Sequence, residues 1–553
     1  MKHFLILFFL FVIILSCKKP ENPENKLSKF SLNCEAATPS ASALIGEYFS
    51  GFITVPYSGG DGSDYNDSAS LPSTSVTGLS ITLQSGSFAK EKGNLIYNVS
   101  GIPTTSGSAN FAIIINGQSC NISLSVKSTE FIQYGTPFVN VTDKQDATIY
   151  QVNIRAFSSQ GNLQGVIARL DSIKALGANV IYLMPTYPLG ILKGINSPYC
   201  IRDYKSINPE FGNLTYFRAL VNAAHNKNMS VIMDWVANHT SYDHEWITDH
   251  KDWYLQDAAG NVLPPPGTGW NDVAQLNFNK PAMRLEMINS MKYWVYNANV
   301  DGFRFDFADG PPVDFWKQTI DTLRNIKSHK LLLLAEGNRS NHFTVGFDFT
   351  FGFSFFSQIK NIYKNNLSVI NINSLNNSEY LNATSGQQVV RYLTNHDVNG
   401  SDGTPLELFG GLKGSMAVFV VVAYMKSVPM IYSGQEVGTA YRLTFPFTGA
   451  NINWNVNPTV TAEYKKVIAF RNASEAIRLG TLLSYSTIDV CAFTKELGSE
   501  KVFVVSNLRN KSINFTLPSS VANTTWTNAM TGFSETTTTE ITLEPFTYLI
   551  YKR

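Results

Sequence analysis

The chain has 553 residues, of which 44% are hydrophobic and 15% charged, and its formal net charge is +1. Such a length suggests about three or four domains of roughly 100–200 residues each, and the composition excludes a chain that is disordered throughout. A near-neutral charge without a Lys/Arg-rich stripe also excludes a typical nucleic-acid-binding protein, so no nucleic acid is expected as a partner.

The first 17 residues predict a signal peptide. Lys2 and His3 precede an apolar run from Phe4 to Leu15; at about 12 residues it is too short to cross a bilayer, which takes around 20, but it is typical of a secretory signal. The run ends in ILSC, which resembles a bacterial lipobox. That resemblance implies lipidation of Cys17 and an exported bacterial membrane lipoprotein of the outer membrane, on its periplasmic or surface face, with the lipid as its only membrane contact. An ordinary signal peptide with a chance cysteine is the alternative.

Residues 18–27 are Pro- and Asn-rich and charged, as in a flexible tether. Residues 28–128 contain short alternating segments such as LSITLQ and NFAIIIN, separated by turn residues, which predict a small β-sandwich that resembles immunoglobulin-like modules. Cys34 and Cys120 flank this segment; export permits a disulfide between them, and two buried free thiols are the alternative. We expect a spacer rather than a glycan-binding module, because all eight tryptophans lie beyond residue 230.

Near residue 147 the pattern changes to apolar runs alternating with amphipathic helical stretches, which is typical of buried parallel strands with crossover helices. The segment LQGVIARLDSIKALG, residues 163–177, predicts one such helix. Eight repeats favour a (β/α)₈ TIM barrel over residues 140–460. The expected strands are TIYQVNI, ANVIYLMP, SVIMDWV, GFRFDF, LLLLAE, GFDFTF, VVRYLTN and VPMIYSG.

The barrel pattern is interrupted once and then ends. Residues from about 240 to 281 separate the third strand from the next helix and contain PPPGTGW, which cannot be helical, so they predict a small inserted domain at the barrel mouth. From residue 461 to 553, segments such as VCAFTKEL and KVFVVSNL predict a C-terminal antiparallel β-domain.

Acidic and basic residues follow the barrel strands at their carboxyl ends, where a TIM barrel builds its active site. Two carboxyl groups on opposite faces of a sugar can break a glycosidic bond, one as nucleophile and one as proton donor. Arg304 lies two residues before Asp306, so it points to the same side and can orient that carboxylate. The residues collected at these ends are Asp234, Asn238, His239, Arg304, Asp306, Glu336, Asn395, His396 and Asp397.

The segments DWVANH, GFRFDFADG, LLAEGN and YLTNHD match, in order and spacing, the signature regions of glycoside hydrolase family 13, the α-amylase family. The resemblance covers roughly residues 147–553. It implies a retaining α-glucoside hydrolase acting on starch-derived α-1,4-glucans or maltooligosaccharides by double displacement. By the same resemblance Asp306 is the nucleophile, Glu336 the general acid/base, and Asp397 the residue that stabilises the distorted sugar.

The resemblance also implies substrate-binding residues. His239, Arg304 and His396 match the family pattern, and SPYCIRDYKSINPEFG resembles the segment that places a tyrosine under the sugar, here Tyr199. Core packing is the alternative for Tyr199. We expect Asp234 to support the rim of the site rather than to contact substrate.

Two departures from the family pattern limit the assignment. Asp309 and Gly310 stand where many family members have Lys-His, which argues against ordinary endo-cleavage of long starch. Asn238 matches a calcium-ligand position, but Gln275 stands where calcium-binding relatives carry Asp, and an amide is a poorer ligand for a hard cation. We therefore expect no required cofactor and no obligatory calcium. The alternatives to α-1,4 hydrolysis are α-1,6 or debranching activity, transglycosylation, and a non-catalytic glycan-binding lipoprotein.

Overall fold

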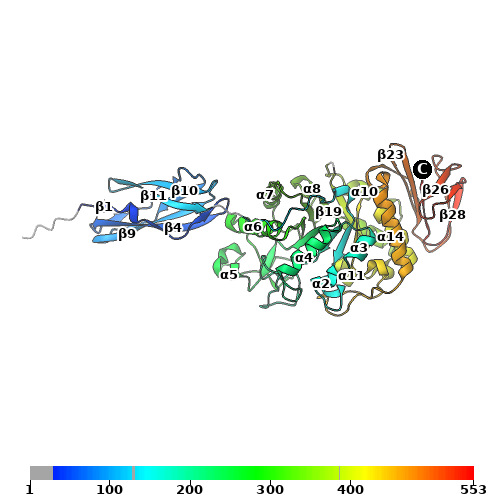
Figure 1. Cartoon of the computed structure of the whole chain (residues 1–553), viewed down its shortest axis with the longest axis horizontal. Helices are drawn as coiled ribbons and strands as arrows, with labels where there is room; N and C mark the ends of the chain where they lie inside the picture. The colour runs from blue at the N-terminus through cyan, green and yellow to red at the C-terminus, as the bar shows by residue number, and fades with distance from the viewer. Residues whose placement is uncertain (1–28, 128–130, 385) are drawn as a thin grey trace, which may run out of the picture. The chain divides into compact units, whose positions relative to one another are not determined.

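The structure, a computed structural model, describes residues 29–127, 131–384 and 386–553, and the chain divides into two compact units, Met1–Thr129 and Glu130–Arg553 (Figure 1). The predicted signal peptide, its Cys17 and the tether lie outside the described residues. Within those residues, no helix has both the length and the apolar character that a bilayer crossing requires.

The first unit is strand-rich, as predicted, and consists mainly of two sheets that share one core. Alternate residues of each strand point inward, so Leu95 and Tyr97 of one sheet and Phe111 and Leu124 of the other belong to the same buried cluster. Cys34 forms a disulfide with Cys120, which decides between the two alternatives for these cysteines. The larger sheet contains β1 (Ser31–Leu32), β2 (Thr38–Pro39), β4 (Phe49–Gly60), β6 (Leu71–Pro72), β7 (Leu79–Leu83) and β9 (Glu91–Gly101), and the smaller contains β3 (Ala43–Leu44), β10 (Gly107–Ile115) and β11 (Gln118–Lys127).

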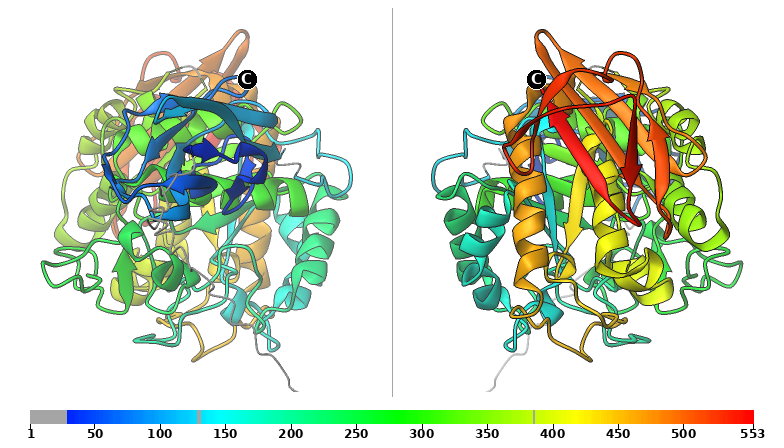
Figure 2. Two further views of the ribbon diagram at one scale, coloured as in Figure 1. Left: turned by 90° about the vertical axis from the view of Figure 1, so that its left-hand side faces the viewer. Right: turned by 90° about the vertical axis from the view of Figure 1, so that its right-hand side faces the viewer.

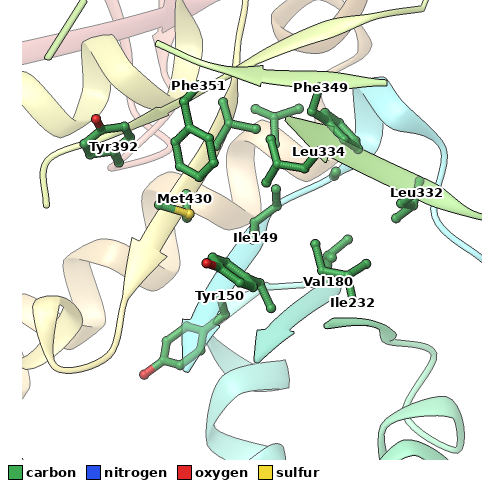
Figure 3. Packing of buried hydrophobic residues seen from close by; sticks show 14 of the residues in the cluster. Ile149, Tyr150, Val180, Ile232, Leu332, Leu334, Phe349, Phe351, Tyr392 and Met430 are labelled. Atoms are coloured by element: carbon green, nitrogen blue, oxygen red, sulfur yellow. The ribbon is translucent and has the colours of Figure 1, made fainter. Parts of the chain in front are cut away.

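The second unit contains a closed parallel barrel, which confirms the predicted fold class. The strands follow one another in chain order and the first also pairs with the last. Their side chains are buried on both faces, which is why the strands are almost uniformly apolar; Figure 3 shows Ile149, Val180, Ile232 and Leu334 in this core. The barrel strands are β12 (Ile149–Val152), β13 (Val180–Leu183), β14 (Ser230–Trp235), β17 (Gly302–Phe305), β18 (Leu332–Ala335), β19 (Phe349–Phe351), β20 (Gln388–Tyr392) and β21 (Val428–Tyr432).

Helices cover the outside of the barrel, and one of them differs from the prediction. The segment 163–177 forms two helices, α2 (Leu163–Ile167) and α3 (Leu170–Leu176), because Arg169 leaves helical geometry with φ −112° and ψ 5°. Its guanidinium lies 4.0 Å from the centre of the Trp454 ring, a cation–π contact that an unbroken amphipathic pattern does not reveal. The other principal barrel helices are α4 (Leu214–His225), α6 (Pro281–Ala298), α7 (Val313–Arg324), α8 (His342–Val345), α9 (Phe353–Asn365), α10 (Asn371–Glu379) and α13 (Gly411–Tyr424).

The segment between β14 and α6 leaves the barrel at the carboxyl end of the third strand. It contains a two-stranded antiparallel sheet of β15 (His239–Ser241) and β16 (Val273–Gln275), and the short helix α5 (Glu245–Asp249). The Pro- and Gly-rich residues 264–269 lie between these elements and form no helix or strand. The inserted segment therefore starts and ends beside the rim at which the acidic residues collect.

The predicted start of the C-terminal β-domain at residue 461 is wrong. Helix α14 (Pro458–Ala473) spans that position, α15 (Glu475–Leu479) follows it, and the first strand begins at Thr481. The buried face of α14 includes Tyr464 and Arg471, whose polar groups obscure the apolar periodicity. Figure 2, on the right, shows this orange helix beside the orange and red strands β22 (Thr481–Ser484), β23 (Val490–Leu497), β24 (Glu500–Asn507), β25 (Ile513–Thr516), β26 (Thr525–Asn528), β27 (Ser534–Thr536), β28 (Glu540–Leu543) and β29 (Tyr548–Lys552).

Candidate active site

One arginine joins acidic residues from three adjacent barrel strands. Arg304 of β17 donates from Nη1 to Asp234 Oδ1 at 2.6 Å and to Asp306 Oδ1 at 3.1 Å. Its Nη2 lies 2.5 Å from Glu336 Oε1. The sheet register explains the convergence, because Asp234 of β14 pairs directly with Arg304, and Glu336 follows the last residue of β18. The strand order thus places the predicted nucleophile and acid/base around one guanidinium.

The backbone after Asp306 also contacts the predicted acid/base. Phe307 has φ 41°, in the left-handed region that a bulky residue rarely adopts. In this conformation its N–H donates to Glu336 Oε2 at 2.9 Å. Strained conformations of this kind persist where the surrounding structure fixes them, and they concentrate at functional sites. The turn after β17 therefore orients the Glu336 carboxyl group from a second direction.

Asp234 and Asp306 lie in surroundings that favour their protonated forms. Burial raises the pKa of Asp306 well above its ordinary value; the neighbouring Glu336 raises it further, and Arg304 opposes the shift. Burial also raises the pKa of Asp234. Several carboxyl groups thus share a single guanidinium, and such groups give up their protons as a coupled set rather than one by one. A retaining glycosidase needs one carboxylate and one carboxylic acid, and a coupled set of carboxyl groups can keep a proton on one of its members.

A chain of hydrogen bonds fixes the predicted substrate residues. Tyr199 Oη donates to Asp234 Oδ2 at 3.0 Å and lies 2.7 Å from His396 Nε2. His396 Nδ1 in turn lies 2.8 Å from the amide nitrogen of Gln151. Since that amide is a donor, Nδ1 accepts and the proton of the ring sits on Nε2. Burial lowers the pKa of His396 to about 4, so the ring is neutral at pH 7.

Gln151 was not identified from the sequence. It is the single polar residue in the middle of the first barrel strand, IYQV, and it is fully buried. A polar side chain in a strand that is otherwise apolar on both faces was the available signal, because such a group needs a buried partner. Its partner is His396, from the far end of the barrel sequence.

A cleft of about 830 Å³ collects most of the predicted site residues. Arg304 differs from the prediction, because its side chain is 0% exposed and contacts acids rather than the cleft. It lies below Asp306 on the same strand, where it acts as a positioning residue. Asp234 is buried as expected and accepts from Tyr182, Tyr199 and Arg304. The cleft is lined by Tyr199, His239, Asp306, Glu336, His396 and Asp397, together with Trp270, Phe307, Asp309 and further residues of the rim.

The residues at the calcium-ligand position do not fit a calcium ion. Asn238 Nδ2 donates to Gln275 Oε1 at 3.0 Å. Gln275 Nε2 donates back to the backbone oxygens of Asn238 at 3.1 Å and Leu276 at 2.9 Å. An N–H group therefore faces the oxygens that a cation would require. In the described part of the chain no group of three or more His, Cys, Asp and Glu could hold a metal.

Asp309, the first departure from the family pattern, is occupied by the loop that follows Glu336. Its Oδ1 lies 2.7 Å from His342 Nε2 and accepts from the Arg339 N–H, and its Oδ2 accepts from the Asn338 N–H at 2.8 Å. These hydrogen bonds lower the pKa of Asp309 although burial opposes them. Asp309 thus holds the loop beside the acid/base in place and is not free to replace a substrate-binding lysine.

Comparison with known proteins agrees with this geometry. A profile of the family described as "Alpha amylase, catalytic domain" matches residues 125–265 and 267–469, and one described as "Alpha-amylase SusG C-terminal domain" matches residues 490–550. The chain is 26% identical over 439 residues to "Alpha-amylase 3" of Dictyoglomus thermophilum, covering 66% of this chain and 85% of that protein.

Another curated protein and a solved structure are also similar to this chain. The chain is 25% identical over 377 residues to "Cyclomaltodextrinase" of Thermoanaerobacter pseudethanolicus, and this match spans 64% of each protein, just under two thirds of that relative's length. Among solved structures, an alpha-amylase from Lactobacillus plantarum superposes with a TM-score of 0.68 at 25% identity. The superposition covers 74% of this chain and 99% of that one.

Proposed function

Because the chain belongs to the α-amylase family of glycoside hydrolases, we propose that it hydrolyses α-1,4-glucosidic bonds of starch-derived glucans or maltooligosaccharides with retention of configuration. One observation carries the proposal. Asp306 and Glu336 leave adjacent strands, contact the same guanidinium at 3.1 and 2.5 Å, and line the same cleft.

The two carboxyl groups perform two displacements. In the first, Asp306 attacks the anomeric carbon and Glu336 gives its proton to the departing glycosidic oxygen, which leaves a glycosyl ester on Asp306. In the second, Glu336 takes a proton from water, and the water oxygen displaces Asp306 from the same carbon. Two inversions restore the original configuration, so the sugar is released as the α-anomer.

The residues around this pair bind and distort the sugar. Asp397 lines the cleft with a side chain that is 61% exposed, so its carboxylate can accept hydrogen bonds from two sugar hydroxyls. Burial lowers the pKa of His239 to about 4, as it does for His396, and two neutral imidazoles offer hydrogen bonds without adding charge to the site. The Tyr199 ring is stacked against His396 with an interplanar angle of 21° and forms the floor under the sugar.

Hydrolysis of α-1,6 bonds and transglycosylation are the alternative activities. Both depend on the leaving-group side of the cleft, where Asp309 and Gly310 differ from the family pattern. A purely glycan-binding protein is disfavoured, because Asp306, Glu336 and Asp397 are all present and the first two are held in contact with Arg304.

Product analysis tests the proposed activity. The protein lacking residues 1–27 is incubated separately with maltoheptaose, pullulan, isomaltotriose and trehalose, with Asp306→Asn as the matched control. The expected result is the release of shorter maltooligosaccharides from maltoheptaose. NMR should show that these products appear first as the α-anomer. Products from only the α-1,6 substrates would move the activity to debranching, and an initial β-anomer would exclude the double displacement.

We also propose export and lipid anchoring through Cys17. The apolar run from Phe4 to Leu15 and the lipobox-like ILSC that ends it support this proposal. Mass spectrometry of the N-terminal peptide from membrane fractions should find Cys17 as the acylated first residue. A Cys17→Ala protein that stays membrane-bound to the same extent would contradict the anchor. The first unit would then act as the spacer between this anchor and the enzyme.

A further inference from the structure

The inserted segment contributes a tryptophan to the active-site cleft. Trp270 follows the PPPGTG sequence and lines the cleft, and it remains 38% exposed. Its ring centre lies 5.6 Å from that of His239 and 5.1 Å from that of Phe307, at interplanar angles of 63° and 78°. Two neighbours thus hold the indole edge to face while much of its surface stays open. A held but exposed aromatic ring inside a cleft is suited to ligand contact.

Phe307 places this aromatic pair beside the acid/base. Its N–H donates to Glu336 Oε2, while its ring meets Trp270. The rings of Tyr199 and His396 stack on each other instead, and the structure records no ring contact from either of them to Trp270 or Phe307. Glu336 protonates the oxygen that departs, so the sugar bound beside Glu336, away from Tyr199, is the leaving group.

The aromatic pair and the Lys-His pattern of relatives exclude each other. A Cβ atom added at Gly310 would lie 2.3 Å from Asn238 Oδ1 and 2.8 Å from Cδ1 of the Phe307 ring. A histidine therefore does not fit at position 310 while Phe307 and Asn238 keep their places. Asp309 is meanwhile held by His342 and the loop after Glu336. The usual polar contacts on this side are replaced by two aromatic rings.

We propose that Trp270, supported by Phe307, is the platform for the sugar on the leaving-group side, and that it captures acceptor sugars by stacking. This inference rests on the proposed function. The apolar face of a pyranose ring buries C–H groups against an aromatic surface, and such contact tolerates different linkages because it uses few directional hydrogen bonds. The cleft is therefore built to return part of the glycosyl group to a glucan instead of to water.

The transfer step balances without any further reactant. The glycosyl ester on Asp306 is attacked by a hydroxyl group of the sugar on Trp270. The new glycosidic C–O bond forms as the ester C–O bond breaks, and Asp306 leaves as a carboxylate. The proton of the attacking hydroxyl passes to Glu336, which is ionised at this stage.

The role of Trp270 is tested by how the glycosyl-enzyme intermediate divides between transfer to a sugar and hydrolysis by water. Maltosyl fluoride loads the enzyme without needing a sugar in the leaving-group site, and added maltose then competes with water. The ratio of transfer product to hydrolysis product is measured by chromatography for the wild type, Trp270→Leu and Trp270→Phe. Leucine keeps an apolar side chain but not a planar one, and phenylalanine keeps a ring. Phe533→Ala, which removes a 75% exposed ring of the C-terminal domain, is the control.

We expect Trp270→Leu to lower the transfer-to-hydrolysis ratio by about fivefold or more and Trp270→Phe to stay within about twofold of the wild type. The ratio does not depend on how fast the intermediate forms, so a purely structural role would leave it unchanged. Unchanged ratios in Trp270→Leu, or a wild type that only hydrolyses at every maltose concentration, would overturn the inference. Failure of the wild type to consume maltosyl fluoride would instead refute the proposed function.

Discussion

Replacing Tyr199 with Phe removes one oxygen atom that has two partners in the site. The hydroxyl donates to Asp234 Oδ2 and accepts from His396 Nε2, while the ring that lies under the sugar is kept. Asp234 retains two other donors, Tyr182 at 2.7 Å and Arg304 at 2.6 Å, so it stays satisfied. His396 Nε2 loses its acceptor at 2.7 Å and keeps only Asp397 Oδ1, which lies 3.4 Å away. The mutation therefore acts mainly on the orientation of His396.

The magnitude follows from the unpaired donor. A buried N–H left without a partner costs about 1–3 kcal/mol. His396 can reduce this cost by turning toward Asp397 or away from Gln151, and either movement takes the ring out of the position in which it binds sugar. If the same cost is carried into the transition state, kcat/KM falls by about 5- to 150-fold.

Tyr182→Phe is the matched control, because Tyr182 donates to the same Asp234 oxygen and the structure records no hydrogen bond from it to His396. Steady-state kinetics on maltoheptaose and thermal unfolding are measured for both variants. We expect Tyr199→Phe to lose about tenfold more kcat/KM than Tyr182→Phe at comparable stability. Equal losses in the two variants would refute the role assigned to the Tyr199–His396 contact.

Three further perturbations have defined outcomes. Asp306→Asn should lower kcat by about 10⁴-fold or more. It should also raise the melting temperature at pH 7. Burial raises the pKa of Asp306 in the folded state, so the stability of the wild type falls as the pH rises from the unfolded-state pKa of 3.8 through the folded-state pKa. A gain in melting temperature that persists at pH 3 would contradict this. Burial lowers the pKa of Lys495 from 10.5 to about 7. Lys495→Met should therefore raise the free energy of unfolding by up to about 5 kcal/mol at pH 6 and by little near pH 10.5. Denaturant unfolding measured at both pH values checks this. EDTA should leave the melting temperature of the wild type unchanged. The Gln275→Asp variant should melt at a lower temperature in EDTA and recover in millimolar calcium. A lower melting temperature of the wild type in EDTA would contradict the inference that the Asn238–Gln275 hydrogen bonds take the place of a calcium ion.

The barrel and the order of the acids were predictable because they depend on local patterns. Parallel strands buried on both faces must be apolar, and the residues just beyond them must collect at one rim. Asp306 and Glu336 could therefore be placed together from the sequence alone. The start of the C-terminal domain could not be, because α14 buries Tyr464 and Arg471, and polar groups on a buried face look like a solvent-facing stretch.

The partners within the site were not predictable, because they depend on side-chain directions across the barrel. Gln151 and His396 are 245 residues apart, and nothing in the sequence around either residue indicates that the two side chains form a hydrogen bond. Arg304 was expected to touch substrate, but its side chain points below Asp306 and is fully buried. The Trp270–Phe307 contact depends on the left-handed backbone at Phe307, which residue type alone argues against.

Asp234 explains how Asp306 can contact a buried arginine and still have a raised pKa. Arg304 is permanently charged, and alone it would hold every neighbouring carboxyl group in its ionised form. Arg304 Nη1 donates to Asp234 Oδ1 at 2.6 Å, and both side chains are 0% exposed. This buried pair is close to neutral, so much of the guanidinium charge is already compensated before Asp306 and Glu336 are considered. Burial is the main reason that the pKa of Asp306 is raised, and the charges of Glu336 and Asp234 add to the increase despite the contact to Arg304. A residue that is not expected to touch substrate thereby limits how strongly Arg304 holds the Asp306 carboxyl group in its ionised form.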